Sequence, residues 1–396
     1  MIALMLLPVY LIINIYIFWR LYRWTKLFSS GPWHKYFRLA VALGFIFCSS
    51  ALLIGFLLGN TDTARFFKVI GNYWAAVQIF SLPVLALFEI VLLVWKRTYG
   101  RRGDTSAYIK FVKKTGAVCL SVVFLLALVG SVNAKIIRTT DYNVTVQKKV
   151  EGVDNLRIVL LSDLHLGVNF DCNQTERLVN KINAKNPDIV LIAGDIFDNN
   201  FEAVDEPERM AQIFKGIKSK YGTFTCYGNH DIEEKILAGF TFSSDKPKVA
   251  SKEMNEFLKA SNITLLRDEY RLVDNKFYIY GRPDFERPGE GIKVRKSPQE
   301  VTAELDKSKP IIVLDHEPRE QEELSKAGVD LDLCGHTHGG QIFPGDIIIK
   351  FFWNNSYGAM DFGSMKNIVT SGVGNFGPNV RLGAKTEICL ISINFP

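Results

Sequence analysis

Hydrophobic and polar residues are distributed differently in the first third of this chain and in the remainder. Long apolar stretches occur near residues 1–19, 39–58, 74–95 and 116–134, and each approaches the roughly 20 residues that a helix needs to cross a bilayer. The stretches are apolar on every face, which disfavours a soluble helical bundle with a single apolar stripe. No basic segment precedes the first stretch, which disfavours a cleaved signal peptide. We therefore predict an α-helical transmembrane region of four helices within residues 1–135.

From about residue 150 onward, short apolar runs alternate with charged segments that have a helical period. The runs that predict buried strands are residues 156–161, 188–193, 223–227, 277–281, 311–314, 331–334, 368–370 and 387–393. Residues 174–186 and 207–220 have the spacing of amphipathic helices. This alternation is typical of α/β folds and predicts a parallel sheet covered by helices, with a second sheet packed on it. We expect a domain at residues 151–396, and a linker at residues 136–150 that enters it as an edge strand.

The basic residues between the apolar stretches predict how the chain is oriented in the membrane. Residues 20–38 contain five Lys and Arg and residues 96–114 contain seven, whereas only Arg65 and Lys68 lie between the second and third stretches. Cytoplasmic loops carry the excess of Lys and Arg. We therefore predict a multi-pass protein of the cell (inner) membrane, with both termini and the domain after residue 135 on the extracytoplasmic side.

The formal net charge of +6 combines two opposite contributions. Residues 1–135 hold 15 Lys and Arg and three acids, so 32 of the 47 basic residues and 38 of the 41 acidic residues lie beyond them. The later domain is therefore acidic. Nucleic acid is not expected as a partner, because binding to its backbone requires a basic face.

Four short polar segments each follow a strongly apolar run in the second part of the chain. They are Asp163-Leu164-His165, Gly194-Asp195-Ile196-Phe197-Asp198, Gly228-Asn229-His230-Asp231 and Gly335-His336-Thr337-His338-Gly339-Gly340, and His316 follows a further run. Asp163 and His165 are two residues apart, as are His336 and His338, so each pair points the same way at the end of an extended strand. Parallel strands bring such ends to one edge of a sheet. Because carboxylate and imidazole donors suit Mn, Fe or Zn, we predict a binuclear metal site there.

In order and spacing, these segments resemble the signature blocks of the calcineurin-like metallophosphoesterase superfamily, over about residues 150–396. The resemblance implies a four-layer α/β/β/α sandwich and the activity of a metal-dependent phosphoric ester hydrolase. It implies two divalent metal ions, with Mn favoured over Fe and Zn, that hold a bridging hydroxide for attack on phosphorus. Position by position, it assigns Asp163, His165 and His338 to the first metal, Asn229, His316 and His336 to the second, and Asp195 to a bridge between them.

His230 lies outside this set of metal ligands. The resemblance implies that His230 contacts a phosphate oxygen or protonates the leaving group. Asp231, which we assign as the second catalytic residue, or Asp163 is expected to orient the imidazole and to set its pKa. We expect Asp198 to support the loop through hydrogen bonds and not to bind metal directly.

Residues 334–344 are similar to a narrower branch of the superfamily, the membrane-associated phosphoesterases. Some members of that branch cleave the pyrophosphate of UDP-2,3-diacylglucosamine. Residues 372–391 also resemble this branch, but Lys385-Thr386-Glu387 stands where Arg-Pro-Glu is commoner. The resemblance therefore implies no particular substrate.

These features predict a membrane-anchored phosphoesterase that hydrolyses a phosphomonoester, a phosphodiester or a pyrophosphate bond in a lipid-linked or envelope substrate. Large apolar residues at 347–353 follow the histidine pair, and we interpret them as a core strand and cover loop in preference to a surface that contacts lipid. The alternative function is a membrane transporter or sensor with a regulatory phosphoesterase-like domain. Glu89, within the third apolar stretch, supports that alternative, but a hydrogen bond between helices explains this residue better.

Overall fold

The computed structural model describes residues 2–28, 31, 33–99, 104–234, 236–237, 240–241 and 248–396. Arg101 and Arg102, which were counted in the second basic segment, lie outside the described residues. The chain divides into two compact units. The first contains Met1–Val132, Leu237–Ser243 and Gly377–Val380, and the second contains Asn133–Ile236, Ser244–Phe376 and Arg381–Pro396.

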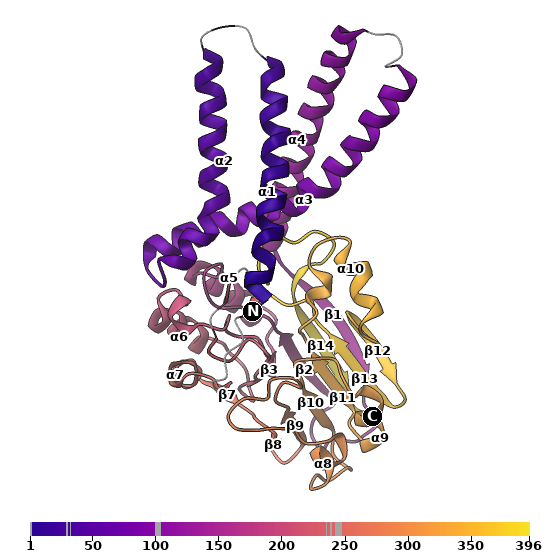
Figure 1. Cartoon of the computed structure of the whole chain (residues 1–396). Coiled ribbons are helices and arrows are strands. Elements are labelled where there is room, and N and C mark those ends of the chain that lie inside the picture. Colours follow the sequence, from indigo (N-terminus) through magenta and orange to yellow (C-terminus); the bar gives the residue numbers. More distant parts are fainter. Residues whose placement is uncertain are drawn as a thin grey trace. The chain divides into compact units, whose positions relative to one another are not determined.

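The first unit is built from long helices (Figure 1). These are α1 (Ile2–Thr25), α2 (Trp33–Leu57), α3 (Asp62–Thr98) and α4 (Thr105–Lys135), with a short 3-10 helix at Lys26–Phe28 after α1. Within the described residues, α2, α3 and α4 are long and apolar enough to cross a membrane, and α1 is not among them. The expectation of four spans is therefore corrected to three candidates.

Polar residues of the first unit are paired between helices. The Tyr16 hydroxyl donates a hydrogen bond of 2.8 Å to Oε1 of Glu89, and Arg20 forms an ion pair with the same carboxylate. Trp74 Nε1 donates to Oδ1 of Asn14 at 3.0 Å. The contacts of Glu89 are the interhelical hydrogen bonding that we expected for this residue.

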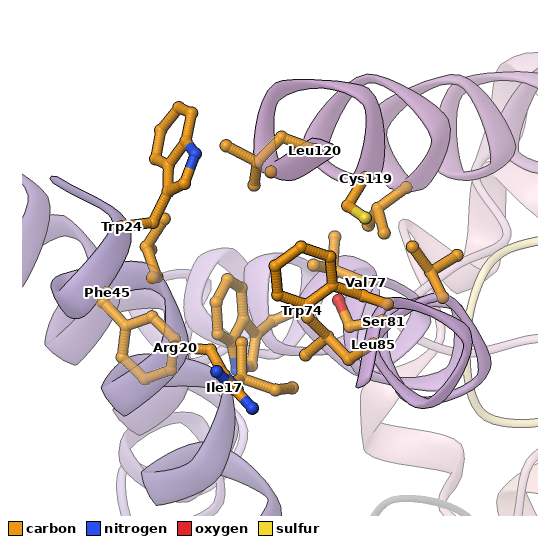
Figure 2. Close-up of a pocket in the computed structure, with 15 residues that line it drawn as sticks. Ile17, Arg20, Trp24, Phe45, Trp74, Val77, Ser81, Leu85, Cys119 and Leu120 are labelled. Carbon is orange, nitrogen blue, oxygen red and sulfur yellow. The ribbon is translucent and has the colours of Figure 1, made fainter. Parts of the chain in front are cut away.

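A cavity of about 190 Å³ lies among these helices. Figure 2 shows that aromatic and aliphatic side chains line it, among them Trp24, Phe45, Trp74 and Leu120. Arg20 is the charged residue in its wall, and this charge is balanced by Glu89. The interior of the first unit is therefore apolar, which suits a membrane anchor.

The second unit begins with a six-stranded sheet in the order β1-β14-β2-β3-β4-β7. Its strands are β1 (Ile137–Thr145), β14 (Thr386–Asn394), β2 (Asn155–Leu161), β3 (Ile189–Ala193), β4 (Thr223–Cys226) and β7 (Ile263–Leu265). Strands β2, β3, β4 and β7 are mutually parallel, and β1 is the expected edge strand. Apolar residues of α5 (Cys172–Asn183), α6 (Pro207–Lys215) and α7 (Lys252–Ala260) share one core cluster with this sheet. The predicted alternation of strands and helices is thus confirmed.

The second sheet has the order β12-β13-β11-β10-β9-β8. Its strands are β12 (Gly358–Phe362), β13 (Met365–Val369), β11 (Leu331–Cys334), β10 (Ile311–Leu314), β9 (Phe277–Gly281) and β8 (Glu269–Val273). Buried residues of both sheets form one core cluster, with Ile158 and Leu191 from the first and Ile279, Ile312 and Leu333 from the second. The second sheet therefore packs on the first, as predicted.

The remaining elements are short. They are α8 (Pro298–Thr302), α9 (Gln321–Ala327), α10 (Gly345–Ile348), 3-10 helices at Phe201–Ala203, His338–Gly340 and Ile349–Phe351, and strands β5 (Ile236–Leu237) and β6 (Phe240–Thr241). Local sequence signals set several helix starts. Asp171 with Gln174 forms a capping box at α5, and Ser297 with Glu300 forms one at α8, so each pair satisfies backbone N–H groups that the first helical turn leaves free.

Candidate metal centre

The predicted site residues follow the carboxyl ends of five parallel strands. Asp163 and His165 follow β2, Asp195 and Asp198 follow β3, Asn229, His230 and Asp231 follow β4, His316 follows β10, and His336 and His338 follow β11. The two sheets are linked here, because the backbone N–H of His336 donates to both carboxylate oxygens of Asp163 at 3.1 Å. The packing of the sheets thus brings together the five loops that carry the polar segments.

One cluster of donor atoms contains Asp163, His165 and His338. The Nε2 atoms of His165 and His338 lie 3.1 Å apart, and Nε2 of His338 lies 3.5 Å from Oδ1 of Asp163. One ligand atom from each residue lies within 4.8 Å of the others, and all three residues are buried. These are the three residues that the sequence assigns to the first metal.

A second cluster contains Asn229, His316 and His336. Oδ1 of Asn229 lies 3.1 Å from Nε2 of His316 and 3.0 Å from Nδ1 of His336. The two imidazole nitrogens are 3.2 Å apart. These are the residues that the sequence assigns to the second metal.

Asp195 lies between the two clusters. Its Oδ2 atom is 3.2 Å from Nε2 of His316 and 3.9 Å from Nε2 of His165. Burial acts to raise the pKa of Asp195, but His316, His230 and His165 together outweigh burial and hold this pKa well below its usual range. The carboxylate is therefore ionised and suited to a bridging position.

The donor set fits two divalent cations. Nδ1 of His316 donates to the carbonyl oxygen of Ala193 at 2.8 Å, so its Nε2 atom is directed at the cluster. Burial opposes a charge on His316, yet the neighbouring carboxylates, Asp195 foremost, raise the pKa of His316 well above the usual value. The second cluster therefore attracts positive charge. Burial lowers the pKa of His336 to about 3 and that of His338 well below the usual value, so both rings are neutral, as metal ligands must be.

The loops that carry the ligands have unusual backbone conformations. Asp163, His165, Asp195, His336 and His338 all have positive φ angles between 46 and 71°. Such angles are uncommon outside glycine and concentrate at functional sites, where the surrounding structure holds them. Close packing of the loops adds to this constraint.

Glycine at position 194 shows how close that packing is. A Cβ atom on Gly194 would lie 2.7 Å from Nδ1 of His316 and 2.7 Å from the backbone nitrogen of Gly228. Gly194 also has a φ of +73°, which a larger residue adopts only with strain. Glycine is therefore needed for the loop after β3 to approach His316.

The carboxylate that faces His230 belongs to Asp198. Oδ1 of Asp198 lies 3.6 Å from Nδ1 of His230 and 3.5 Å from Nδ1 of His165. Asp231 instead accepts hydrogen bonds of 2.8 Å from the backbone N–H groups of Phe197 and Gly228. Asp231 therefore organises the loops, and the expectation that it orients His230 is wrong, because its oxygens are already occupied by backbone donors.

Arg381 is a site residue that the sequence analysis missed. Its fully buried guanidinium lies 3.3 Å from Nδ1 of His338 and donates to the carbonyl oxygens of Gly374 and Lys385, both at 2.6 Å. Burial lowers the pKa of Arg381 to about 10. Its position within residues 372–391, which resemble the membrane-associated branch, was the only available signal.

Phe376 forms an aromatic wall beside the first cluster. Its ring centroid lies 5.4 Å from that of His230, 6.2 Å from that of His165 and 6.4 Å from that of His338. Gln341 holds this residue through two hydrogen bonds, because its side chain accepts from the Phe376 N–H at 3.0 Å and donates to the Phe376 carbonyl at 2.9 Å. The ring is suited to exclude water from His230.

A second aromatic wall flanks the other cluster. The ring centroid of Trp353 lies 5.2 Å from that of His336. The guanidinium of Arg319 is held between Trp353 and Phe285, at 4.9 Å from each ring. The same guanidinium forms ion pairs with the carboxylates of Glu317 and Glu286, which fix its position beside the Trp353 ring.

Comparison with known proteins agrees with this geometry. The sequence model of the calcineurin-like phosphoesterases matches residues 156–340. A metallophosphoesterase from Campylobacter jejuni is 26% identical over 96% of this chain and 94% of its own length. A transmembrane protein with a metallophosphoesterase domain from Danio rerio is 27% identical over 89% of this chain and 79% of its own length. A metallophosphoesterase from Aquifex aeolicus is 29% identical over 68% of this chain and 98% of its own length. The chain therefore contains a calcineurin-like metallophosphoesterase domain and is similar to metallophosphoesterases from bacteria and a vertebrate.

Proposed function

We propose that this protein is a membrane-anchored, binuclear phosphoesterase that hydrolyses a phosphomonoester, phosphodiester or pyrophosphate bond in a lipid-linked or envelope substrate. The observation that carries this proposal is the pair of donor clusters that share Asp195. One cluster alone would suit a structural ion. Two clusters joined by a carboxylate suit the two-metal chemistry of phosphoryl transfer.

The proposed architecture is the four-layer α/β/β/α sandwich of the superfamily. Helices α5, α6 and α7 share a core with the first sheet. Val301 of α8 and Leu324 of α9 share a separate core with Tyr278, Ile311 and Val313 of the second sheet. The helix-covered clusters and the core between the sheets take alternate residues of the same strands, which supports a layered arrangement.

In this proposal, each donor cluster holds one divalent metal ion. Asp163, His165 and His338 hold the first ion, Asn229, His316 and His336 hold the second, and Asp195 contacts both. When bound, such ions lower the pKa of water and neutralise phosphoryl oxygens. The chain fixes the ligands in place by burial and by contacts such as that between His316 and Ala193. Mn remains the favoured ion, with Fe and Zn as the others that this donor set suits.

His230 is the proposed proton carrier. Burial lowers its pKa to about 4, so the imidazole is neutral at pH 7 in the free enzyme. Its Nδ1 atom faces Asp198, so its Nε2 atom is the one available to the substrate. A bound phosphoryl group brings negative charge, which favours protonation of His230 and transfer of that proton to the leaving oxygen.

The proposed location is the extracytoplasmic face of the inner membrane. The basic segments before α2 and after α3 are separated by two candidate spans and so lie on the same side. Helix α4 then carries the chain to the other side, whether or not α1 crosses the membrane. A domain on that side favours an envelope substrate over cytoplasmic nucleotide-sugar lipid intermediates.

The test uses the purified full chain with bis-p-nitrophenyl phosphate as substrate. Asp195→Asn and His336→Ala are expected to abolish turnover and to lower the metal content measured by plasma mass spectrometry, while circular dichroism stays unchanged. The matched control is Glu208→Gln, which removes an exposed carboxylate from α6 and leaves the site intact. Undiminished turnover in either site variant would refute the proposed centre.

A further inference from the structure

A run of exposed apolar side chains follows the metal-binding loop. Phe343, Ile347, Ile348, Phe351 and Phe352 are 57, 49, 50, 83 and 74% exposed. They belong to α10, to the 3-10 helix after it and to the flanking residues. The interpretation of residues 347–353 as a core strand and cover loop is therefore corrected, because residues 345–351 form short helical turns and Phe351 and Phe352 are exposed. Large exposed apolar patches mark interaction surfaces.

A pocket of about 160 Å³ lies beside this apolar segment. Its lining includes Gly339 of the metal-binding loop, Asp346, Lys350, Tyr357 and Lys385. Within the described part of the chain, neither Lys350 nor Lys385 forms an ion pair, and Oδ1 of Asp346 is buried without a hydrogen-bond partner. The two lysines exceed the single carboxylate, so the pocket carries net positive charge and favours an anion.

The wall of this pocket is joined to the end of α4. Residues 115–134 contain no charged side chain, and 20 helical residues span roughly 30 Å, the thickness of the hydrocarbon core. Nδ2 of Asn133 donates to the carbonyl oxygen of Ala384 at 3.2 Å, and the Thr386 hydroxyl donates to the carbonyl oxygen of Ala134 at 3.1 Å. The pocket wall at residues 383–385 is thus bonded to the C-terminal turn of α4.

We propose that residues 343–352 and this pocket form a membrane-contacting surface, in which the apolar side chains enter the leaflet and Lys350 and Lys385 bind the phosphate of an anionic lipid headgroup. The proposed occupant is a lipid leaflet, because the surface combines exposed apolar groups with unpaired ammonium groups at the end of a membrane-spanning helix. Gly339 lies in both the metal-binding loop and the pocket wall. The surface would then bring lipid-borne phosphoesters to the metal centre from the plane of the membrane. Only this delivery of substrate rests on the proposed function.

The experiment measures the membrane depth of Phe351 in the full chain. The chain is reconstituted in nanodiscs of phosphatidylcholine and phosphatidylglycerol, and Phe351→Cys is labelled with an environment-sensitive fluorophore. Glu323→Cys, at an exposed position on α9, is the matched control. The unsubstituted chain corrects for labelling of Cys48 and Cys119, which are half-buried. Residues of interfacial segments lie about 5–10 Å into the headgroup and acyl boundary, so lipids with a nitroxide near the headgroup should quench roughly half of the emission at position 351 and little at position 323.

A second pair of variants tests the lysines. In the Phe351→Cys chain, quenching should increase when phosphatidylglycerol is added to phosphatidylcholine, because the two lysines bind anionic headgroups. Lys350→Glu and Lys385→Glu in the same background should remove this increase. Equal quenching at positions 351 and 323 would overturn the proposal. Loss of the quenching at position 351 on addition of a second copy of the chain or of a soluble partner would also overturn it, because the surface would then bind protein in preference to lipid. Turnover of bis-p-nitrophenyl phosphate by the unlabelled chain tests the proposed function separately, so failure of one is distinguishable from failure of the other.

Discussion

Replacing Asp198 by Asn tests how the site controls proton transfer. The substitution keeps the shape of the side chain and removes the negative charge that lies 3.5 Å from Nδ1 of His165 and 3.6 Å from Nδ1 of His230. Neither nitrogen has a hydrogen-bond partner among the described residues, so the Asp198 carboxylate is the charged group nearest to both. Asp198 is therefore the group that orients both rings, one in the first metal cluster and one beside it.

The expected loss is set by two magnitudes. A charge pair at about 4 Å is worth about 4 kcal/mol at an effective dielectric constant of about 20. The Asp198 side chain is 27% exposed, so solvent reduces this value. Loss of the carboxylate partner of a metal-binding histidine costs about 10–100-fold in affinity or activity, equivalent to about 1.4–2.7 kcal/mol. We expect kcat to fall within that range.

The assay compares leaving groups of different acidity. If His230 protonates the leaving oxygen, Asp198→Asn should reduce hydrolysis of an alkyl phosphoester more than hydrolysis of a p-nitrophenyl ester, because p-nitrophenolate departs without a proton. Isothermal titration with Mn should show weaker binding at one of two sites, because Asp198 orients His165 of the first cluster. Unchanged kcat for both substrates together with unchanged metal affinity would refute the role assigned to Asp198. An equal loss for both substrates would instead assign His230 to binding a phosphate oxygen.

Two further predictions concern buried charges in the domain. Burial raises the pKa of Asp332 to about 7, whereas the unfolded value is about 3.9, so the folded state holds the extra proton and loses stability as the pH rises between these values. Asp332→Asn should therefore reduce the loss of stability between pH 5 and pH 8, by up to about 3 kcal/mol in free energy of unfolding. A pH profile of the melting temperature that is unchanged by the substitution would contradict this. Arg381→Lys keeps the charge but cannot donate to the carbonyls of Gly374 and Lys385 and to His338 together, so Mn affinity should fall about 10–100-fold. Wild-type affinity in a titration would show that the guanidinium contacts are dispensable.

Strand positions could be predicted from the sequence because the central strands are buried on both faces. Residues 277–281, 311–314 and 331–334 were predicted with the bounds that the structure shows for β9, β10 and β11. Continuous apolar runs of this length have few alternatives in an α/β domain. The ends of those runs also located the polar segments, because chemistry in such folds lies where parallel strands end.

Partners of individual side chains could not be predicted in the same way. Asp231 is adjacent to His230 in the sequence, yet Asp198 faces the ring, because the loops after β3 and β4 are hydrogen-bonded to each other at this edge of the sheet. Arg381 lies 43 residues from His338 and reaches it only through tertiary packing. Neither contact leaves a periodic signal in the chain.

The sequence by itself determined where the apolar helices and strands lie, which donor residues follow the strands and which metals such donors suit. The tertiary structure decided which donors share a cluster, which carboxylate serves His230 and which apolar residues are exposed. Residues 347–352 show the difference most clearly, because their composition matches a core strand while Phe351 is 83% exposed. Hydrophobicity is a property of a side chain, whereas burial depends on neighbours that only the folded chain supplies.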